Sequence, residues 1–242
     1  MQEWFNELKR QFVLNFINDN RWQFLLNSLW VTLRITFFAL LIGIAIGVIV
    51  AIVRSTHDKN IGAIRSSTGR LILRLFNGIC KVYLTVIRGT PVVVQLMIFY
   101  FIILVSIRNG ELIGIIAFGI NAGAYVAEIF LSGIMSVDNG QFEAGRSLGF
   151  NYIQTMRHII IPQAFKNILP TLANEFIVLL KETAVVGYVA VQDLTKAGDI
   201  IRGRTFSAFM PLIAVALVYL TLVLFFTWLV GKLERRLRSS ER

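Results

Sequence analysis

Long runs of apolar residues follow one another along the chain, separated by short polar segments. A helix needs about 20 predominantly apolar residues to cross the hydrocarbon core of a bilayer. Five runs meet or approach this requirement, and the second of them is short: 24–53, 91–107, 112–137, 168–191 and 206–231. The pattern predicts an all-α membrane protein with about five transmembrane helices, whose two chain ends lie on opposite sides of the membrane.

The basic residues predict which side is which. Three polar segments hold fifteen of the Lys and Arg residues: 54–88, 138–167 and 232–242. The other three hold seven: 1–23, 108–111 and 192–205. Because short cytoplasmic segments carry an excess of Lys and Arg, we expect the N-terminus outside and the C-terminus in the cytoplasm. Topology thus accounts for the formal net charge of +10, and no nucleic-acid partner is expected.

Segment 1–23 is expected to lie on the extracytoplasmic side. Its first ten residues, MQEWFNELKR, carry acids where a cleavable signal peptide needs a basic region, so no such signal is predicted. Five apolar residues recur at helical spacing: Trp4, Phe5, Leu8, Phe12 and Phe16. This spacing fits a short helix in the membrane interface, and a frayed polar leader fits equally well.

Segment 64–88 combines an apolar stripe with the basic residues Arg70, Arg74, Lys81 and Arg88. This amphipathic pattern predicts a helix on the cytoplasmic surface that leads into the second span. Glycine and proline in the following RGTP sequence (88–91) are expected to break or kink the helix, because proline lacks a backbone N–H and constrains the residue before it.

A polar interruption, EAGRSLGFNYIQTMRHIIIP (143–162), falls in the cytoplasmic segment between the third and fourth spans. A first short helix is expected after Asp138 or Asn139, because either residue can cap a helix N-terminus. Gly149 can end that helix in a left-handed conformation. A second helix, 152–160, is expected to stop before the terminal proline. Two short helices at an angle form a compact knob that can fit a cleft in a cytosolic partner.

This interruption resembles the EAA loop of permease subunits in bacterial ATP-binding-cassette (ABC) importers. Five positions carry the spacing: Glu143, Ala144, Gly149, Ile159 and Pro162. Gly145 stands where a second alanine is usual, and Ile161 where leucine is usual. Because glycine weakens a helix by about 1 kcal/mol relative to alanine, Gly145 is expected to weaken the first helix locally.

The resemblance extends along most of the chain. Five segments are similar, in order, to the polar amino acid permease family of His/Glu/Gln/Arg type: RGTPVVVQ (88–95), NAGAYVAEI (121–129), GQFEAGRSLG (140–149), IIIPQAFKNILP (159–170) and NEFIVLLKETAVV (174–186). The similarity assigns residues 24–236 to one transmembrane permease domain and 237–242 to a cytoplasmic tail.

The resemblance implies a MetI-like permease fold in the bacterial inner membrane, with cytoplasmic coupling helices in segment 138–167. It implies a pore made of two permeases, identical or similar, with cytosolic ATPase subunits docked on that segment and an extracytoplasmic binding protein that delivers the amino acid. The implied coupling residues are Glu143, Ala144, Gly145, Ser147, Gly149, Ile159 and Pro162. The sequence has no GxxxxGK[ST] pattern, so ATP and Mg²⁺ are expected on the partner ATPase and no cofactor on this chain.

Polar residues inside the predicted spans are candidates for the substrate path, because polar groups at mid-membrane are costly unless they are functional or paired. The candidates are Thr90, Asn121, Tyr125, Glu128 and Glu182. Three of them, Asn121, Tyr125 and Glu128, share a helical face by their spacing. The two acids favour a cationic substrate such as arginine, lysine or histidine, while a structural hydrogen bond between spans explains Glu128 equally well.

Two further sets of charged residues have simpler interpretations. Arg34 is expected to extend its guanidinium toward the outer surface and to position the first span. Glu175 and Glu182 share a helical face. Either Lys181 neutralises Glu182, or Glu175 braces the coupling segment.

A secondary transporter that works alone is the alternative function. Intramembrane charges suit ion coupling, but such transporters often carry internal repeats, and none is visible. An enzyme is disfavoured, because the sequence shows no nucleophile–base pair or cofactor loop. The single cysteine, Cys80, and the distant His57 and His158 argue against a metal site. Co-purification of an ATPase subunit would distinguish the importer from the secondary transporter.

Overall fold

The computed structural model describes residues 1–63 and 66–239, and every regular element in these two ranges is helical. The predicted tail 237–242 and the predicted helix 64–88 therefore lie partly outside the described residues. The elements are α1 (Gln2–Phe12), η1 (Val13–Ile17), η2 (Asn18–Asn20), α2 (Arg21–Asn60), η3 (Ile61–Ala63), α3 (Ser67–Gly89), α4 (Val92–Ile98), η4 (Phe99–Ile103), α5 (Gly110–Met135), α6 (Asn139–Ser147), α7 (Tyr152–Thr155), η5 (Met156–Ile160), α8 (Ile161–Glu182), η6 (Thr183–Val189), α9 (Leu194–Thr205) and α10 (Phe209–Ser239).

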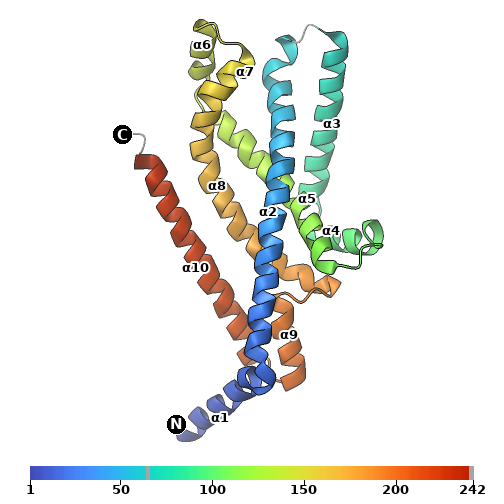
Figure 1. The fold of residues 1–242 in the computed structure, drawn as a ribbon, viewed down its shortest axis with the longest axis vertical. Helices are drawn as coiled ribbons and strands as arrows, with labels where there is room; N and C mark the ends of the chain where they lie inside the picture. The colour runs from blue at the N-terminus through green and yellow to red at the C-terminus, as the bar shows by residue number, and fades with distance from the viewer. Residues whose placement is uncertain (64–65, 240–242) are drawn as a thin grey trace.

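The helices form an elongated bundle, with α6 and α7 at one end and α1 and α9 at the other (Figure 1). Among the described residues, three helical stretches are long and apolar enough to cross a membrane: Gln2–Lys59, which contains α2, and then α5 and α10. The α3–α4 pair makes a fourth if a bent pair counts as one span. Three or four such helices in one helical bundle of the described residues confirm the predicted all-α membrane fold.

The predicted helix break in the RGTP sequence is confirmed, and the apolar run that follows it, 91–107, is shorter as a helix than predicted. Only Val92–Ile98 and the π-helical turn Phe99–Ile103 are helical, and this unit is bent by 111° from α3. The bend follows from the RGTP sequence, where Thr90 and Pro91 are extended and end α3. The apolar run therefore folds across the bundle instead of along it (Figure 1).

The predicted amphipathic helix in 64–88 corresponds to α3, which leads into the next apolar run as expected and also packs against the bundle. It runs back along α2 from the α6 end toward the middle of the bundle (Figure 1). Asn77 and Leu84 are buried, and the Tyr83 hydroxyl donates a hydrogen bond to the carbonyl of Ile120 in α5. These contacts with α2 and α5 make α3 part of the bundle, and α3 and α4 together form the second crossing if a bent pair counts as one span.

The fourth predicted span, 168–191, corresponds to the later part of α8 and the 3₁₀ turns of η6. Helix α8 carries Lys166, Glu175, Lys181 and Glu182, and it does not qualify as a span by apolar length. Its apolar side is nevertheless packed, because Leu179 and Leu180 are fully buried. Hydropathy alone therefore does not show that α8 packs in the core of the bundle.

Close packing of α2 on α5 forms the centre of the bundle. A Cβ atom on Gly43 would lie 2.9 Å from Ala122 Cβ, and one on Gly119 would lie 2.7 Å from Ile42 Cβ. Small residues on both helices thus let the two backbones approach closely, as in other membrane helix pairs. The adjoining buried cluster includes Ile35, Phe118 and Leu179, so α8 packs against the same centre.

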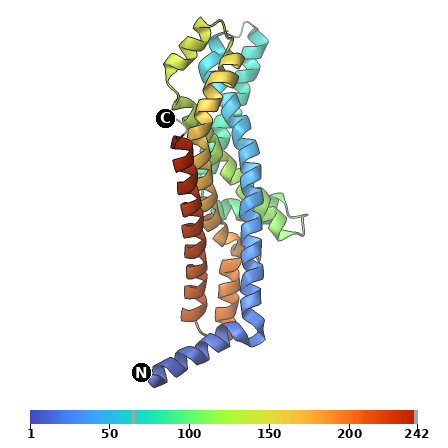
Figure 2. The ribbon, with the colours of Figure 1, turned by 60° about the vertical axis from the view of Figure 1, so that its left-hand side comes forward.

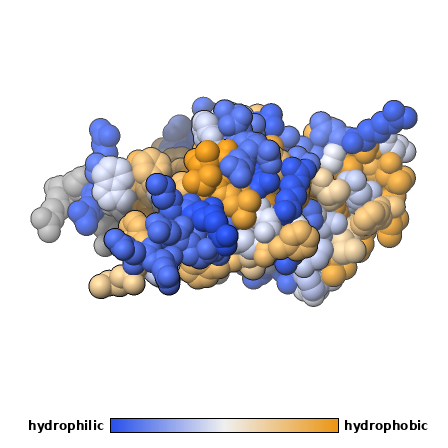
Figure 3. Space-filling model, turned by 90° about the horizontal axis from the view of Figure 1, so that it is seen from below, coloured by the Kyte–Doolittle hydropathy of each residue, from blue (hydrophilic) through white to orange (hydrophobic). Residues whose placement is uncertain are grey.

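Helix α1 extends sideways from the base of the bundle (Figures 1 and 2). Trp4 and Phe5 are exposed, and the helix is regular from Gln2 to Phe12, which favours the helix over the frayed leader. Viewed from below, hydrophilic side chains cover much of this end, with hydrophobic patches between and beside them (Figure 3).

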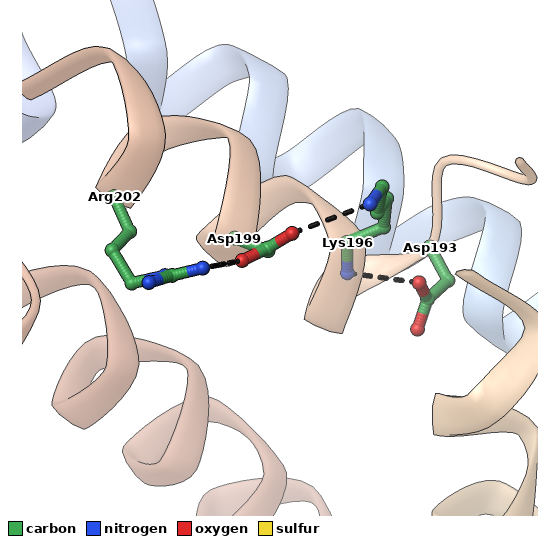
Figure 4. A network of polar contacts seen from close by, with 4 residues as sticks. All are labelled: Asp193, Lys196, Asp199 and Arg202. Atoms are coloured by element: carbon green, nitrogen blue, oxygen red, sulfur yellow. Dashed lines mark hydrogen bonds and ion pairs between the residues drawn. The ribbon is translucent and has the colours of Figure 1, made fainter. Parts of the chain in front are cut away.

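A network of polar contacts stabilises α9 at the same end of the molecule (Figure 4). The buried Asp193 carboxylate caps the helix by accepting hydrogen bonds from the backbone N–H groups of Lys196, at 2.9 Å, and Thr195, at 3.1 Å. Asp199 lies between the side chains of Lys196 and Arg202 and accepts hydrogen bonds from both. The hydrogen bond from Arg202 is the main reason that the pKa of Asp199 lies below its ordinary value.

Candidate functional site

The coupling segment starts with a capped helix, as the sequence predicted. Asp138 Oδ1 accepts a hydrogen bond from the backbone N–H of Gly140 at 2.6 Å, so Asp138 is the N-cap of α6. Gly149 ends the turn after α6 with a φ of +82°, a conformation that side chains with a Cβ adopt at a cost. Asn151 and Gln154 then form a capping box at the start of α7.

The predicted stop before Pro162 is wrong. Helical structure continues from α7 through the π-helical turn η5 into α8, and Pro162 lies in the first turn of α8. Proline is tolerated in a first turn, because the backbone N–H that it lacks has no intrahelical acceptor there. The coupling segment is thus joined to α8 by unbroken helix over 152–182.

Gly145 has a packing role that the sequence did not reveal. It is buried, and a Cβ atom there would lie 2.7 Å from Thr155 Cγ2 and 3.2 Å from Ile159 Cδ1. The glycine therefore lets α6 lie directly on α7 and η5. Gly145 thus holds α6 against the helix that continues into the bundle, a packing role in addition to the local weakening of α6 that its helix propensity predicts.

The remaining coupling residues lie mainly on the surface. Glu143, Ala144, Ser147, Gly149 and Pro162 are exposed, while Ile159 packs beside the buried Ile160. The Ser147 hydroxyl donates to the Glu143 carbonyl at 3.0 Å.

Large apolar side chains accompany these residues. Leu148 is 72% exposed and Ile153 is 73% exposed. Exposed leucine and isoleucine at the end of a helical knob suit contact with another protein.

A second polar region lies at the bend between α3 and α4. The Gln95 side-chain N–H₂ donates to the Ile87 carbonyl at 2.7 Å and to the Thr90 hydroxyl oxygen at 2.8 Å. Its carbonyl oxygen accepts from Asn121 Nδ2 of α5 at 2.9 Å. Gln95 thus satisfies a carbonyl freed at the end of α3 and ties the bend to α5. The sequence signal for it was a lone amide in the apolar run VVVQLMIF.

The predicted face of α5 does turn toward this bend. Asn121 is only 2% exposed, and its carbonyl oxygen has no hydrogen-bond partner among the described residues. Glu128 pairs with Arg88, the last arginine of α3, at 2.7 Å between Oε1 and Nη1. The Arg88 guanidinium lies 6.0 Å from the centre of the Tyr125 ring. Sequence reasoning placed Arg88 in a motif but missed its role as the partner of Glu128.

Glu182 is not joined to this face. Within the described ranges, the side chains of Glu182 and Glu175 have no hydrogen bond or ion pair, and none joins Lys181 to Glu182. Arg34 also differs from expectation, because its guanidinium pairs with Glu111 of α5 at 3.0 Å instead of extending alone toward the surface.

Residues 43–239 match the family described as binding-protein-dependent transport system inner membrane component. The chain belongs to this family. This permease is therefore a transport component of an ABC importer, located in the inner membrane, and its fold is MetI-like.

Several relatives and solved structures cover nearly the whole permease. It is 35% identical over 217 residues to the putative glutamine transport system permease protein GlnP of Rickettsia typhi, covering 88% of this chain and 93% of that protein. It is 34% identical over 221 residues to the arginine transport system permease protein ArtQ of Bacillus subtilis, covering 90% and 94%. The comparisons confirm the resemblance to amino acid permeases that the sequence motifs indicated.

The crystal structure of an amino acid ABC transporter with histidines is similar to this permease, with a TM-score of 0.78, 40% identity and coverage of 88% of this chain and 94% of that one. The inward-facing methionine ABC transporter MetNI has a TM-score of 0.75 at 21% identity, covering 91% and 99%, and shows the fold alone.

Proposed function

We propose that this permease moves a polar amino acid across the inner membrane as part of an ABC importer driven by separate cytosolic ATPase subunits. The observation that carries the proposal is the coupling segment itself. It presents an exposed, capped knob at one end of the bundle and is continuous with a helix that enters the core. ATP and Mg²⁺ belong to the ATPase partner, and this chain supplies the path and the mechanical link.

The link from the knob to the middle of the bundle can be followed residue by residue. Helix α6 packs on η5 at Gly145, and η5 continues into α8, whose 22 residues span about 33 Å. At the far end of α8, Val186 and Val189 of η6 share a buried cluster with Leu96 of α4. A shift of α6 by a docked ATPase is thereby passed along α8 to the bend that Gln95 holds.

The substrate class follows from the polar face and from the relatives. Polar amino acids fit a path that offers an amide, an ion pair and hydroxyl groups at mid-bundle. The cationic preference proposed for arginine, lysine or histidine rests on Glu128 and Glu182. Because Arg88 balances Glu128, Glu182 alone still supports it, and glutamine belongs in the same test panel because both glutamine and arginine systems occur among the relatives.

We also propose an extracytoplasmic binding protein as the donor of substrate and a second permease, identical or similar, as the other half of the pore. The end formed by α1 and α9, much of which is hydrophilic, suits contact with the binding protein (Figure 3).

In this orientation the N-terminus lies outside the cell and the C-terminus lies in the cytoplasm. A reporter fused after Arg242 should read cytoplasmic, and a tag before Gln2 should be accessible from outside. A cytoplasmic N-terminal tag would contradict the orientation.

Reconstitution tests the function as a whole. The permease should co-purify with an ATPase subunit, and proteoliposomes that contain both should take up labelled glutamine, arginine, lysine or histidine only with ATP and a binding protein. Uptake driven by an ion gradient in the absence of any ATPase would show a secondary transporter instead.

A further inference from the structure

The ion pair between Arg88 and Glu128 is incomplete as a structural contact. A single hydrogen bond, Nη1 to Oε1 at 2.7 Å, joins the two side chains, which remain 44% and 46% exposed. Among the described residues, the other N–H groups of Arg88 and the second oxygen of Glu128 make no hydrogen bond. The pair therefore joins α3 to α5 at the bend while keeping donors and acceptors free.

Membrane physics limits what can bind to such a pair. An unpaired charge inside a membrane bundle is costly, so the empty site is more stable while Arg88 and Glu128 neutralise each other. A ligand with one charge would leave one of the two side chains unpaired. A ligand with one carboxylate and one ammonium can pair with both, so that the site stays neutral whether it is empty or occupied.

From this geometry we propose that Arg88 and Glu128 bind the common head of an α-amino acid. The Arg88 guanidinium binds the α-carboxylate, and the Glu128 carboxylate binds the α-ammonium. These two contacts with the ligand replace the contact between Arg88 and Glu128. Charge-assisted hydrogen bonds of this kind are stronger than neutral ones and directional. The proposal rests on the proposed function, and it makes the charge of the substrate side chain irrelevant at this point of the path.

The buried Asn121 oxygen supplies the second part of the site. Asn121 lies on the same face of α5 as Glu128, seven residues away, which is about 10 Å along the helix axis. Its side-chain carbonyl oxygen lacks a donor, while its N–H₂ is held by Gln95. Because a buried acceptor without a partner is costly, the Asn121 oxygen can accept a hydrogen bond from an N–H group of a ligand that extends along this face of α5.

Charge substitutions in the assembled importer test the head-group assignment. Arg88→Gln and Glu128→Gln should each lower uptake of glutamine, arginine or histidine roughly tenfold to hundredfold, the effect of losing one charge-assisted hydrogen bond. Assembly and stimulation of the ATPase by the loaded binding protein should persist. Arg34→Gln is the matched control, because Arg34 also pairs with a glutamate of α5 but at Glu111, and its uptake should stay close to normal.

The exchanged variant, Arg88→Glu with Glu128→Arg, separates binding from a purely structural contact. It should restore the thermal stability of the complex, because the ion pair is re-formed. It should not restore uptake, because the α-carboxylate and α-ammonium of the ligand would have to exchange places. Restored uptake, or normal uptake in both single variants, would overturn the proposal while leaving the importer function intact. A wild-type complex that takes up no amino acid with ATP would instead refute the proposed function itself.

Thermal unfolding of the wild-type complex without binding protein gives a measurement that needs no variant. Histidine should raise the melting temperature, whereas histamine, which lacks the carboxylate, and imidazolelactate, which lacks the ammonium, should not. Equal stabilisation by all three ligands would refute recognition of the head.

Discussion

The coupling segment and the bend between α3 and α4 are both helix breaks that contain glycine, yet they place their side chains in opposite ways. The coupling segment exposes Leu148 and Ile153. At the bend, by contrast, Gln95 is 6% exposed and its amide makes hydrogen bonds to both α3 and α5.

This difference indicates that the two breaks serve different functions. A break whose apolar groups face outward lacks a partner within the chain, so it suits docking of another protein. A break whose polar groups are satisfied internally holds a fixed geometry inside the bundle. Substitutions at the first break should therefore disturb coupling to the ATPase, and substitutions at the second should disturb the bundle itself.

Gly145→Val should have the largest effect. A β-branched side chain there collides with Thr155 and Ile159, and overpacking of this kind costs roughly 1–3 kcal/mol. We expect α6 to move off η5, with uptake lowered about tenfold or more and less ATPase recovered with the permease in pull-down assays.

A rescue design checks the cause. Gly145→Ala should be impaired on its own and should recover when combined with Thr155→Ala, which removes the atoms at 2.7 and 2.8 Å from the added Cβ. The packing role of Gly145 would be contradicted if uptake by the double variant stayed as low as uptake by Gly145→Ala, with both variants stably inserted in the membrane.

Gly149→Val should have the next largest effect. Its φ of +82° is strained for a β-branched residue, by roughly 1–2 kcal/mol. We expect the complex to assemble but to hydrolyse ATP with reduced uptake per ATP, measured in the same proteoliposomes. Gly149→Asn is the matched control, because asparagine tolerates positive φ, and the two variants should differ. Identical coupling ratios would count against a conformational role.

Gln95→Leu should have a smaller effect on coupling and a measurable effect on stability. The substitution leaves the Ile87 carbonyl and the Asn121 amide unsatisfied inside the bundle, at a cost of roughly 1–3 kcal/mol. We expect a lower melting temperature of the purified complex with the ATPase still bound. An unchanged melting temperature would show that Gln95 does not hold the bend.

Local signals in the sequence were enough to predict the coupling segment. Capping by Asp138 and the left-handed turn at Gly149 depend only on neighbouring residues, and both are confirmed. The role of Gly145 could not be predicted, because its partners Thr155 and Ile159 approach it only after the chain folds back.

The bend shows the other limit of sequence reasoning. Glycine and proline in the RGTP sequence predicted a break before the apolar run 91–107, but they could not give its angle, which is 111° between α3 and the helical unit that follows. The Arg88–Glu128 pair joins residues 40 positions apart, so spacing along one helix could place Glu128 on a face without revealing its partner.

Photo-cross-linking at Leu148 tests the central claim most directly, namely that the ATPase docks on the exposed coupling segment. A photoreactive amino acid at Leu148, which is 72% exposed, should cross-link to the ATPase subunit in intact membranes. The same probe at Leu217 of α10, which is 56% exposed, should not. Cross-linking at Leu217 but not at Leu148, in variants that retain uptake, would contradict the account.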